Sequence, residues 1–406
     1  MTHFLKDILR QPEELRRTLE HLTAPAGAGR GALEAATAAV RGARHVYLTG
    51  IGSSWHAALN VSMLFHQHAH PVYLHDAAEL LAFAAFPRDS AMIIISRSGK
   101  STEIVQLAAK ARQAGVTVIG ITNVPEGTLA KEAHHAIVVP IALDHAISVN
   151  TYTTLALAAG LLAHSVVAEN GKADSSASGC GGPQPEGRND KSGVSQQGAG
   201  PQALSSPRQE EKRQQAAALQ KGLAEALSKA FAEAGRAIPG WQEQIAKSDW
   251  LAPHKTTYFL ARGSSLGSAY EARLMWEEGV KTAATAMGTG SFRHGPQEII
   301  SKETRFGIWM DGAQMREQDL ALARDLGKLG ARVMLIGQRL PEDAGDLVFQ
   351  LPAIPTGWQF LIDIIPAQLV AERLAGLSGV DCDAFRLASY VVDDEGGLLA
   401  KQGKKN

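Results

Sequence analysis

The sequence predicts an α/β protein with two tandem doubly wound subdomains, each built on a mostly parallel five-stranded sheet flanked by helices. Short apolar strands alternate with helical stretches in both halves of the 406-residue chain, as in proteins with parallel sheets. Residues 257–265 repeat the pattern of residues 46–54, and residues 329–337 repeat that of residues 114–120. Because both matches occur in the same order and at nearly the same offset, they indicate an internal duplication.

The chain begins with an expected helical segment, residues 1–35. Leucine and isoleucine recur there at steps of three and four residues, and Pro12 is expected in the first turn of a helix. The first subdomain is expected over residues 36–168. Its strands are predicted at residues 45–49, 71–74, 91–95, 116–121 and 136–139. The third of these is almost entirely apolar, which is typical of a parallel sheet covered on both faces.

The composition changes abruptly after the first subdomain. Residues 169–215 are dominated by Gly, Ser, Pro, Gln and charged residues, so a disordered linker is expected there. The second subdomain is predicted over residues 216–380 and a C-terminal tail over residues 381–406.

Composition and charge exclude several classes of protein. The 40 Lys and Arg residues nearly balance 41 Asp and Glu residues, so a nucleic-acid partner is not expected. No apolar run is long enough to span a membrane, and the N-terminus does not resemble a signal peptide. The two cysteines cannot form a disulfide framework. We therefore expect a cytoplasmic enzyme or regulator without a membrane partner.

The loop that follows the third strand is the strongest functional signal. Residues 96–102 read Ser-Arg-Ser-Gly-Lys-Ser-Thr and lead into a helix. Hydroxyl groups, backbone N–H groups and a helix N-terminus together favour phosphate binding, and Gly99 allows close approach of the backbone. The Walker A pattern is absent, so nucleotide hydrolysis is not indicated. The alternative is that Ser98 or Ser101 only caps the helix.

Two other motifs are weaker. Residues 50–54, Gly-Ile-Gly-Ser-Ser, begin like a dinucleotide fingerprint but lack its third glycine, so they are better interpreted as a second hydroxyl-bearing turn beside the same crevice. The histidines of residues 66–75 have the composition of a metal site but flank a turn, and a solvated surface turn is the preferred interpretation. No metal and no cofactor are expected.

These loops, the Gly-Ser-Ser turns of both halves and the motif Arg293-His294-Gly295-Pro296 resemble the sugar isomerase (SIS) superfamily. More specifically, the chain resembles the isomerase module of glucosamine-6-phosphate synthase and its single-module relatives, which include aminosugar-phosphate deaminases and fructosamine-phosphate deglycases. The resemblance covers nearly the whole chain outside residues 169–215. It implies a sugar-phosphate isomerase or an aminosugar-phosphate deaminase that acts on a hexose or hexosamine 6-phosphate.

The resemblance also implies roles for individual residues. Glu278 matches the base that moves a proton between C1 and C2, although Glu277 is an equal candidate from its sequence context alone. His294 matches the histidine that opens the sugar ring in the neighbouring subunit's site, which implies a homodimer. The residues that match phosphate-binding positions are Ser54, Ser96, Arg97, Ser98 and Ser101, and the chemistry of the loop adds Gly99 and Thr102 as candidates. The remaining substrate-binding candidates are Gly52, Ser53 and Ser148.

The sequence departs from the synthase pattern in three ways. The module starts at once with no cysteine at position 2, so glutamine-dependent ammonia supply is not expected. The lysine three residues before the base is Met275 here, and Ser389 or Tyr390 stands near the place of the imine-forming lysine. Whether a tail lysine such as Lys401 replaces it stays open. In addition, the second half has no Ser-rich loop where one would follow a strand, because residues 306–313 read Phe-Gly-Ile-Trp-Met-Asp-Gly-Ala, so one sugar-phosphate site per chain is expected. The alternative function is a non-catalytic sugar-phosphate sensor.

Overall fold

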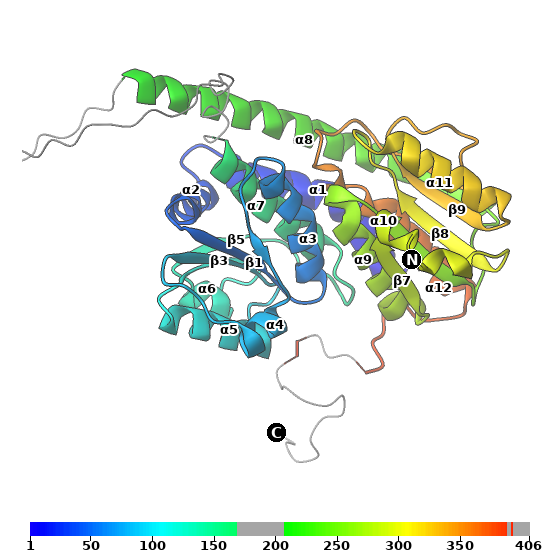
Figure 1. Cartoon of the computed structure of the whole chain (residues 1–406), viewed down its shortest axis with the longest axis horizontal. Helices are drawn as coiled ribbons and strands as arrows, with labels where there is room; N and C mark the ends of the chain where they lie inside the picture. Colours follow the sequence, from blue (N-terminus) through cyan, green and yellow to red (C-terminus); the bar gives the residue numbers. More distant parts are fainter. Residues whose placement is uncertain (169–206, 388–390, 393–406) are drawn as a thin grey trace, which may run out of the picture.

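The protein has two parallel sheets, one in each half of the chain, as the strand and helix pattern predicts (Figure 1). The computed structural model describes residues 1–168, 207–387 and 391–392. The predicted tandem α/β architecture is confirmed. Most of the predicted linker, residues 169–206, lies outside the described residues. Helix α8 begins at Pro207, so the last part of the predicted linker, residues 207–215, is helical instead.

The first sheet has the strand order β2-β1-β3-β4-β5, and all of its strands are parallel. Its strands are β1 (His45–Thr49), β2 (Tyr73–Leu74), β3 (Ser90–Ile95), β4 (Thr117–Thr122) and β5 (His135–Val138). The helices that follow them along the chain are α3 (Ser53–His66), α4 (Ala77–Phe83), α5 (Thr102–Gln113), α6 (Thr128–Glu132) and α7 (Asn150–Val167). Every residue of β3 is buried, which explains its apolar sequence.

The second sheet has the order β10-β9-β8-β6-β7, which is the same topology as the first sheet. Its strands are β6 (Thr256–Ala261), β7 (Ala284–Gly288), β8 (Thr304–Trp309), β9 (Arg332–Gly337) and β10 (Leu347–Gln350). Its helices are α9 (Leu266–Met275), α10 (Thr289–Phe292), α11 (Arg316–Lys328) and α12 (Ile364–Leu377). The order places a topological switch point between β1 and β3 in one sheet and between β6 and β8 in the other. Ligands of open α/β sheets bind at such points.

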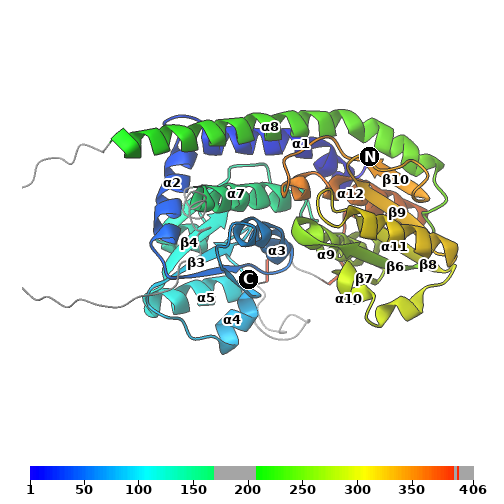
Figure 2. The same ribbon diagram turned by 45° about the horizontal axis from the view of Figure 1, so that its top comes forward.

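Two helices of the described part of the chain, α1 (His3–Thr23) and α8 (Pro207–Lys247), lie alongside both subdomains and outside this repeated pattern. Helix α8 runs along both subdomains beside α1, as Figures 1 and 2 show. Helix α1 continues through Pro12, so the predicted helix start at this proline is wrong. Pro12 is buried and lies against Gly235 of α8, and this packing supports the proline inside the helix.

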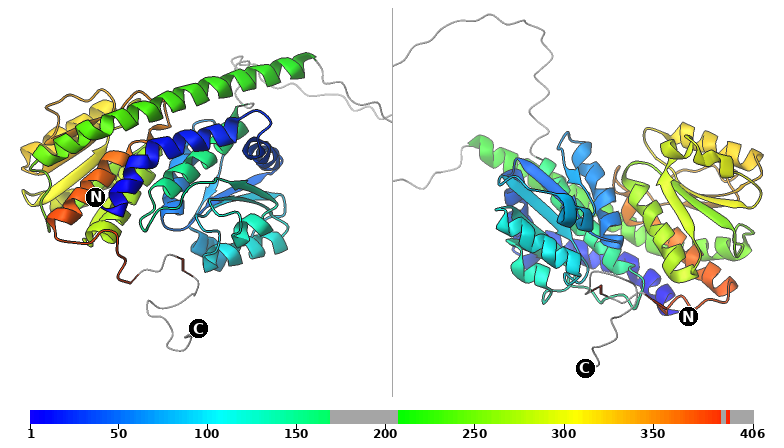
Figure 3. Two further views of the ribbon diagram at one scale, coloured as in Figure 1. Left: turned by 180° about the vertical axis from the view of Figure 1, so that it is seen from behind. Right: turned by 60° about the horizontal axis from the view of Figure 1, so that its bottom comes forward.

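Helix α2 (Ala28–Arg41) belongs to the first subdomain. It packs on β5 and α7, so the predicted boundary between residues 35 and 36 falls inside a helix that covers the first sheet. The N-terminal helices and the edge of the first sheet are seen together from behind in Figure 3.

The two halves meet where α3 packs directly on α9. A Cβ atom added at Gly267 of α9 would lie 2.1 Å from the backbone oxygen of His56 on α3, so only glycine allows this approach. The contact fixes the start of α3, which borders the first switch point, relative to α9, which leads to Glu278.

Candidate active site

A cavity of about 240 Å³ lies at the carboxyl end of the first sheet, beside β1 and β3. Most residues predicted for the site line it. They are Gly52, Ser53, Ser54, Ser96, Arg97, Ser98, Ser101, Ser148 and Glu278. The cavity therefore joins the first subdomain's hydroxyl-rich loops to a carboxylate from the second.

The loop after β3 is organised by its own serines. The Ser96 hydroxyl accepts a hydrogen bond from the Gly99 N–H (3.1 Å), and the Ser98 hydroxyl accepts one from the Lys100 N–H (3.1 Å). Gly99 has a φ of 62°, which favours glycine, and it is buried and does not line the cavity, contrary to its predicted role at the phosphate. These bonds hold the loop in a turn that leads into α5, whose N-terminus favours anions.

Arg97 and Ser148 come from different loops but touch each other. A guanidinium nitrogen of Arg97 donates to the Ser148 hydroxyl at 3.2 Å. This contact holds a positive charge at the cavity that Ser54 also lines. The arrangement supplies cation, hydroxyl and N–H donors, which are the groups that a phosphate monoester requires.

The two glutamates that are candidates for the base have different surroundings in the structure. Glu278 lies in the π-helical turn Trp276–Val280 that continues α9, is half-buried and lines the cavity. Glu277 is exposed and forms an ion pair with Arg273 (3.4 Å). The turn ends at Lys281, whose left-handed φ of 58° reverses the chain toward β7. Short π-helical turns often mark functional sites.

Burial raises the pKa of Glu278 to about 7. The nearby Glu271 carboxylate adds to this increase, whereas the positive charge of Arg97 opposes it. A carboxyl group that titrates near neutrality is suited to accept and return a proton.

Glu271 forms a buried pair with His56 across the interface between the subdomains. The His56 Nδ1 atom lies 2.7 Å from Glu271 Oε2, and both side chains are nearly inaccessible to solvent. His56 lies two residues after Ser54 on α3. The pair therefore connects the hydroxyl-bearing turn to the helix that carries Glu278, a link that no sequence motif indicated.

The C-terminal segment also reaches the cavity, which the sequence analysis missed. Phe385 and Val392 line the cavity, and the Val392 carbonyl accepts a hydrogen bond from the Thr102 N–H at 3.1 Å. Thr102, predicted to bind phosphate, is therefore engaged by the chain itself and does not line the cavity. Glu103 in the first turn of α5 does line it. Glu103 directly follows the serine loop in the sequence, and this position could have identified it as a lining residue.

His294 does not lie in this cavity. It is an exposed residue in the turn between α10 and the 3₁₀ turn Pro296–Ile299. Its predicted insertion into a neighbouring subunit's site stays a prediction. Ser389, Tyr390 and Lys401 lie outside the described residues.

The structure contributes two further observations on ligands and membranes. Within residues 1–168, 207–387 and 391–392, no three His, Cys, Asp or Glu side chains are grouped to hold a metal ion. In the same residues, no helix combines the length and apolar character of a membrane span.

The chain was compared with known families and with curated relatives. Residues 39–165 match the family model described as SIS domain. Among the relatives is the glutamine–fructose-6-phosphate aminotransferase (isomerizing) of Symbiobacterium thermophilum, which is 26% identical over an alignment of 403 residues that covers 95% of this chain. The same enzyme of Pyrobaculum aerophilum is 22% identical over 97% of this chain. In both comparisons the chain spans 58% of the relative's length.

Solved structures share the fold. The C-terminal domain of glucosamine-fructose-6-phosphate aminotransferase from Francisella tularensis aligns with a TM-score of 0.74 and 19% identity, covering 94% of this chain and 97% of that one. A glucosamine-6-phosphate deaminase from Thermotoga maritima aligns with a TM-score of 0.70 and 21% identity, covering 96% and 99%. The resemblance to the SIS superfamily predicted from the motifs is confirmed, and the first subdomain is a SIS domain.

Proposed function

From this SIS-domain fold we propose that the protein is a sugar-phosphate isomerase or an aminosugar-phosphate deaminase/isomerase, acting on a hexose or hexosamine 6-phosphate. One observation carries the proposal. Glu278, whose burial raises its pKa to about 7, lines the same cavity as the hydroxyl-rich loop after β3. A group of residues suited to bind an anion thus lies in the same cavity as a base suited to remove a proton from carbon.

In this proposal the first subdomain holds the phosphate. The hydroxyls of Ser54, Ser96, Ser98 and Ser101 and the guanidinium of Arg97 line one side of the cavity. Their donors match the acceptor oxygens of a phosphate monoester. Held there, the sugar chain extends toward Glu278, which comes from the second subdomain.

Glu278 is proposed to act as the proton shuttle. Its carboxylate removes the proton from the carbon beside the carbonyl or imine, which leaves an enediol or enolamine. The resulting carboxylic acid then returns the proton to the adjacent carbon. A pKa near the working pH keeps both forms accessible, which favours this two-way transfer.

His294 is proposed to open the sugar ring in the site of a partner subunit. Its exposure in this chain, outside its own cavity, is compatible with such a role. An imidazole can both donate and accept a proton, which ring opening requires. A homodimer is part of the proposal.

The alternative is a sugar-phosphate sensor without catalysis. It is favoured by one observation: among the described residues that line the cavity there is no lysine that could form an imine with an open-chain sugar. Position 275, three residues before the base, is a buried methionine. Proton transfer by Glu278 does not need that amine, so turnover decides between the two functions.

The deciding experiment compares Glu278→Gln with the matched control Glu277→Gln. Each variant is incubated in D₂O with fructose 6-phosphate, glucose 6-phosphate, glucosamine 6-phosphate and tagatose 6-phosphate, and NMR follows product formation and deuterium at C1 and C2. We expect exchange and turnover in the wild type and in Glu277→Gln. We expect a loss of at least about 100-fold in Glu278→Gln with binding retained, because general-base catalysis contributes 10²–10⁴-fold. Thermal stabilisation by a sugar phosphate without exchange in the wild type would support the sensor. Unchanged turnover in Glu278→Gln would exclude the assigned base.

A further inference from the structure

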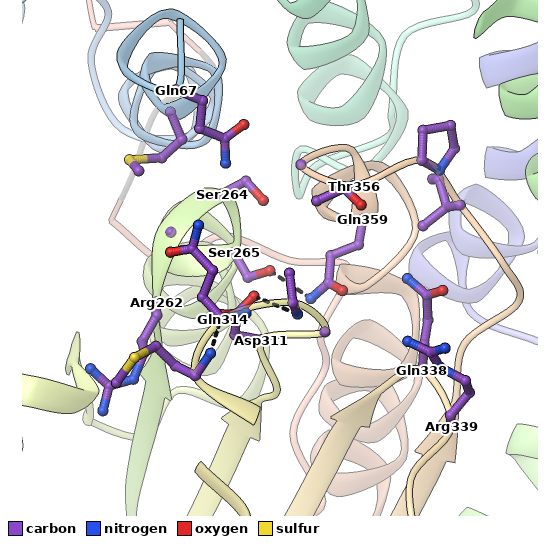
Figure 4. A pocket seen from close by; sticks show the side chains of 18 residues that line it. Gln67, Arg262, Ser264, Ser265, Asp311, Gln314, Gln338, Arg339, Thr356 and Gln359 are labelled. Carbon is purple, nitrogen blue, oxygen red and sulfur yellow. Dashed lines mark hydrogen bonds between the residues drawn. The ribbon is translucent and has the colours of Figure 1, made fainter. Parts of the chain in front are cut away.

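A second cavity, of about 310 Å³, lies at the carboxyl end of the second sheet. It occupies the switch point beside β6 and β8, which corresponds in topology to the position of the first cavity beside β1 and β3. Its walls are loops that follow β6, β8, β9 and β10, together with the end of α3 from the first subdomain (Figure 4). The polar lining residues are Gln67, Arg262, Ser264, Ser265, Asp311, Gln314, Gln338, Arg339, Thr356 and Gln359.

The anion position of this second cavity is filled by the protein's own carboxylate. Asp311, two residues after β8, accepts hydrogen bonds from the backbone N–H groups of Ala313 (3.2 Å), Gln314 (2.9 Å) and Met315 (2.8 Å). These groups precede α11, where the corresponding loop of the first subdomain would present N–H groups to a phosphate. A phosphate placed here would meet a carboxylate of the same sign.

The remaining charges of the wall are largely balanced. Arg262 donates from Nε to Asp319 at 2.8 Å, and the Asp319 side chain is fully buried. Asp319 also accepts from the Asp311 backbone N–H at 3.3 Å. The exposed Arg339, on the loop after β9, adds a positive charge to the same wall as Asp311. The wall therefore carries no net charge that would attract an anion or a cation strongly.

Uncharged polar side chains supply the rest of the hydrogen-bonding capacity. Figure 4 shows Gln67 near Ser264, with Thr356 and Gln338 on the other side of the cavity. Within the described part of the chain, the side chains of Gln67, Ser264, Gln314, Gln338 and Thr356 have no hydrogen-bond partner. Amides and hydroxyls each offer both donors and acceptors, which is the complement of a row of sugar hydroxyls. Met63 and Ile354 add apolar surface for the face of a ring.

We propose that the second cavity is a binding site for an uncharged polyhydroxylated ligand, an unphosphorylated sugar of about hexose size. Its volume is at the lower end for small-molecule pockets, which suits a single sugar ring. The first cavity would select the phosphorylated sugar through its hydroxyl loop, and the second would reject it through Asp311. This site is independent of catalysis in the first cavity, and its test measures binding alone.

The test is isothermal titration of the full chain with glucose, fructose and N-acetylglucosamine, each compared with its 6-phosphate. Arg97→Ala weakens phosphate binding in the first cavity and changes no residue of the second cavity, so binding of an uncharged probe should persist in this variant. The double variant Gln67→Ala/Gln314→Ala removes two exposed amides from the second cavity. Gln113→Ala, an exposed glutamine at the end of α5 away from both cavities, is the matched control.

We expect at least one uncharged probe to bind with a Kd of about 1 mM, since a small polar ligand makes few apolar contacts. The double variant should weaken it at least about tenfold, as expected for the loss of one to two net hydrogen bonds, while Gln113→Ala should not. Absence of binding by all three probes up to about 10 mM, ten times that Kd, would overturn the proposal. So would loss of binding in Arg97→Ala, or equal binding in the double variant and its control.

A second variant tests the role of Asp311 directly. Asp311→Asn removes the negative charge and keeps one oxygen, which can accept from the Gln314 and Met315 N–H groups that now bond Oδ2, while the Ala313 N–H loses its acceptor Oδ1. Its unfolding transition in urea verifies that it folds. In the Arg97→Ala background, this variant should bind glucose 6-phosphate more tightly than does Arg97→Ala alone. An unchanged or lower affinity in the folded variant would contradict the exclusion of phosphate by Asp311.

Discussion

The electrostatic influence of Glu271 on Glu278 can be tested by the substitution Glu271→Gln. The two residues are seven positions apart on α9 and its π-helical continuation, which corresponds to about 10 Å along a helix axis. Two like charges at that distance repel by about 1.7 kcal/mol at an effective dielectric constant of about 20, or about one pKa unit. The contact of Glu271 Oε2 with His56 Nδ1 at 2.7 Å partly offsets the Glu271 charge and so reduces this repulsion. Glutamine keeps an acceptor for His56 and removes the charge.

The sign follows from the form of the base that is active. A general base works as the carboxylate, so the rate rises as the pH increases through its pKa, which is about 7 in the wild type. Without the Glu271 charge the pKa of Glu278 falls, and the acid limb of the pH–rate profile moves to lower pH by up to about one unit.

Two measurements check this shift. The first is the pH dependence of kcat/KM with the substrate found in the deuterium-exchange panel. The second needs no substrate: the infrared carboxyl band of Glu278 is titrated as the difference between each protein and the same protein carrying Glu278→Gln. The control Glu277→Gln removes an exposed, ion-paired charge and should move the pKa by less than about 0.3 unit. An acid limb that stays in place or moves to higher pH in Glu271→Gln would refute the electrostatic reasoning.

Three further predictions concern the phosphate loop and the partner subunit. Arg97→Ala should weaken binding of the sugar 6-phosphate about 10- to 100-fold in calorimetry, since a hydrogen bond to a charged group contributes about 1.5–3 kcal/mol. An unchanged Kd would show that Arg97 does not bind the phosphate. Gly99→Ala places a Cβ at a φ of 62° and 3.0 Å from the Leu129 Cβ, so urea unfolding should show a loss of about 1–2 kcal/mol. Gly31→Ala, in open space on α2, should instead stabilise by about 0.5–1 kcal/mol, and a loss there would show that helix propensity is not the controlling factor. Glu278→Gln and His294→Ala chains can be mixed and refolded together. About one quarter of wild-type turnover should return if a symmetric dimer pairs each base with the partner's histidine. No recovery would argue against sites shared between subunits.

The periodicity of the sequence predicted most of the fold because it reflects burial. An all-apolar run is needed in a strand covered on both faces, and residues 91–95 lie in β3 (Ser90–Ile95), which is buried throughout. Element ends and the paths of long helices were less predictable. Pro12 ordinarily disrupts a helix, but packing against α8 holds it inside α1, and that contact joins residues more than 200 positions apart.

Local sequence was enough to identify the groups that could carry out chemistry: a hydroxyl-rich loop after an apolar strand, a pair of adjacent glutamates and a turn containing Gly, Ser and Ser in each half. It was enough because the ends of parallel strands collect at one edge of a sheet. Which of these groups meet depends on the three-dimensional packing of the two subdomains. The contact between α3 and α9 at Gly267 brings Glu278 rather than Glu277 to the first cavity, since adjacent residues of a helical turn face different directions. The packing also places His294 outside the first cavity, and it places the Asp311 carboxylate against backbone N–H groups in the second cavity. Neither position could be predicted from spacing along the chain, because both depend on which segments are close in three dimensions.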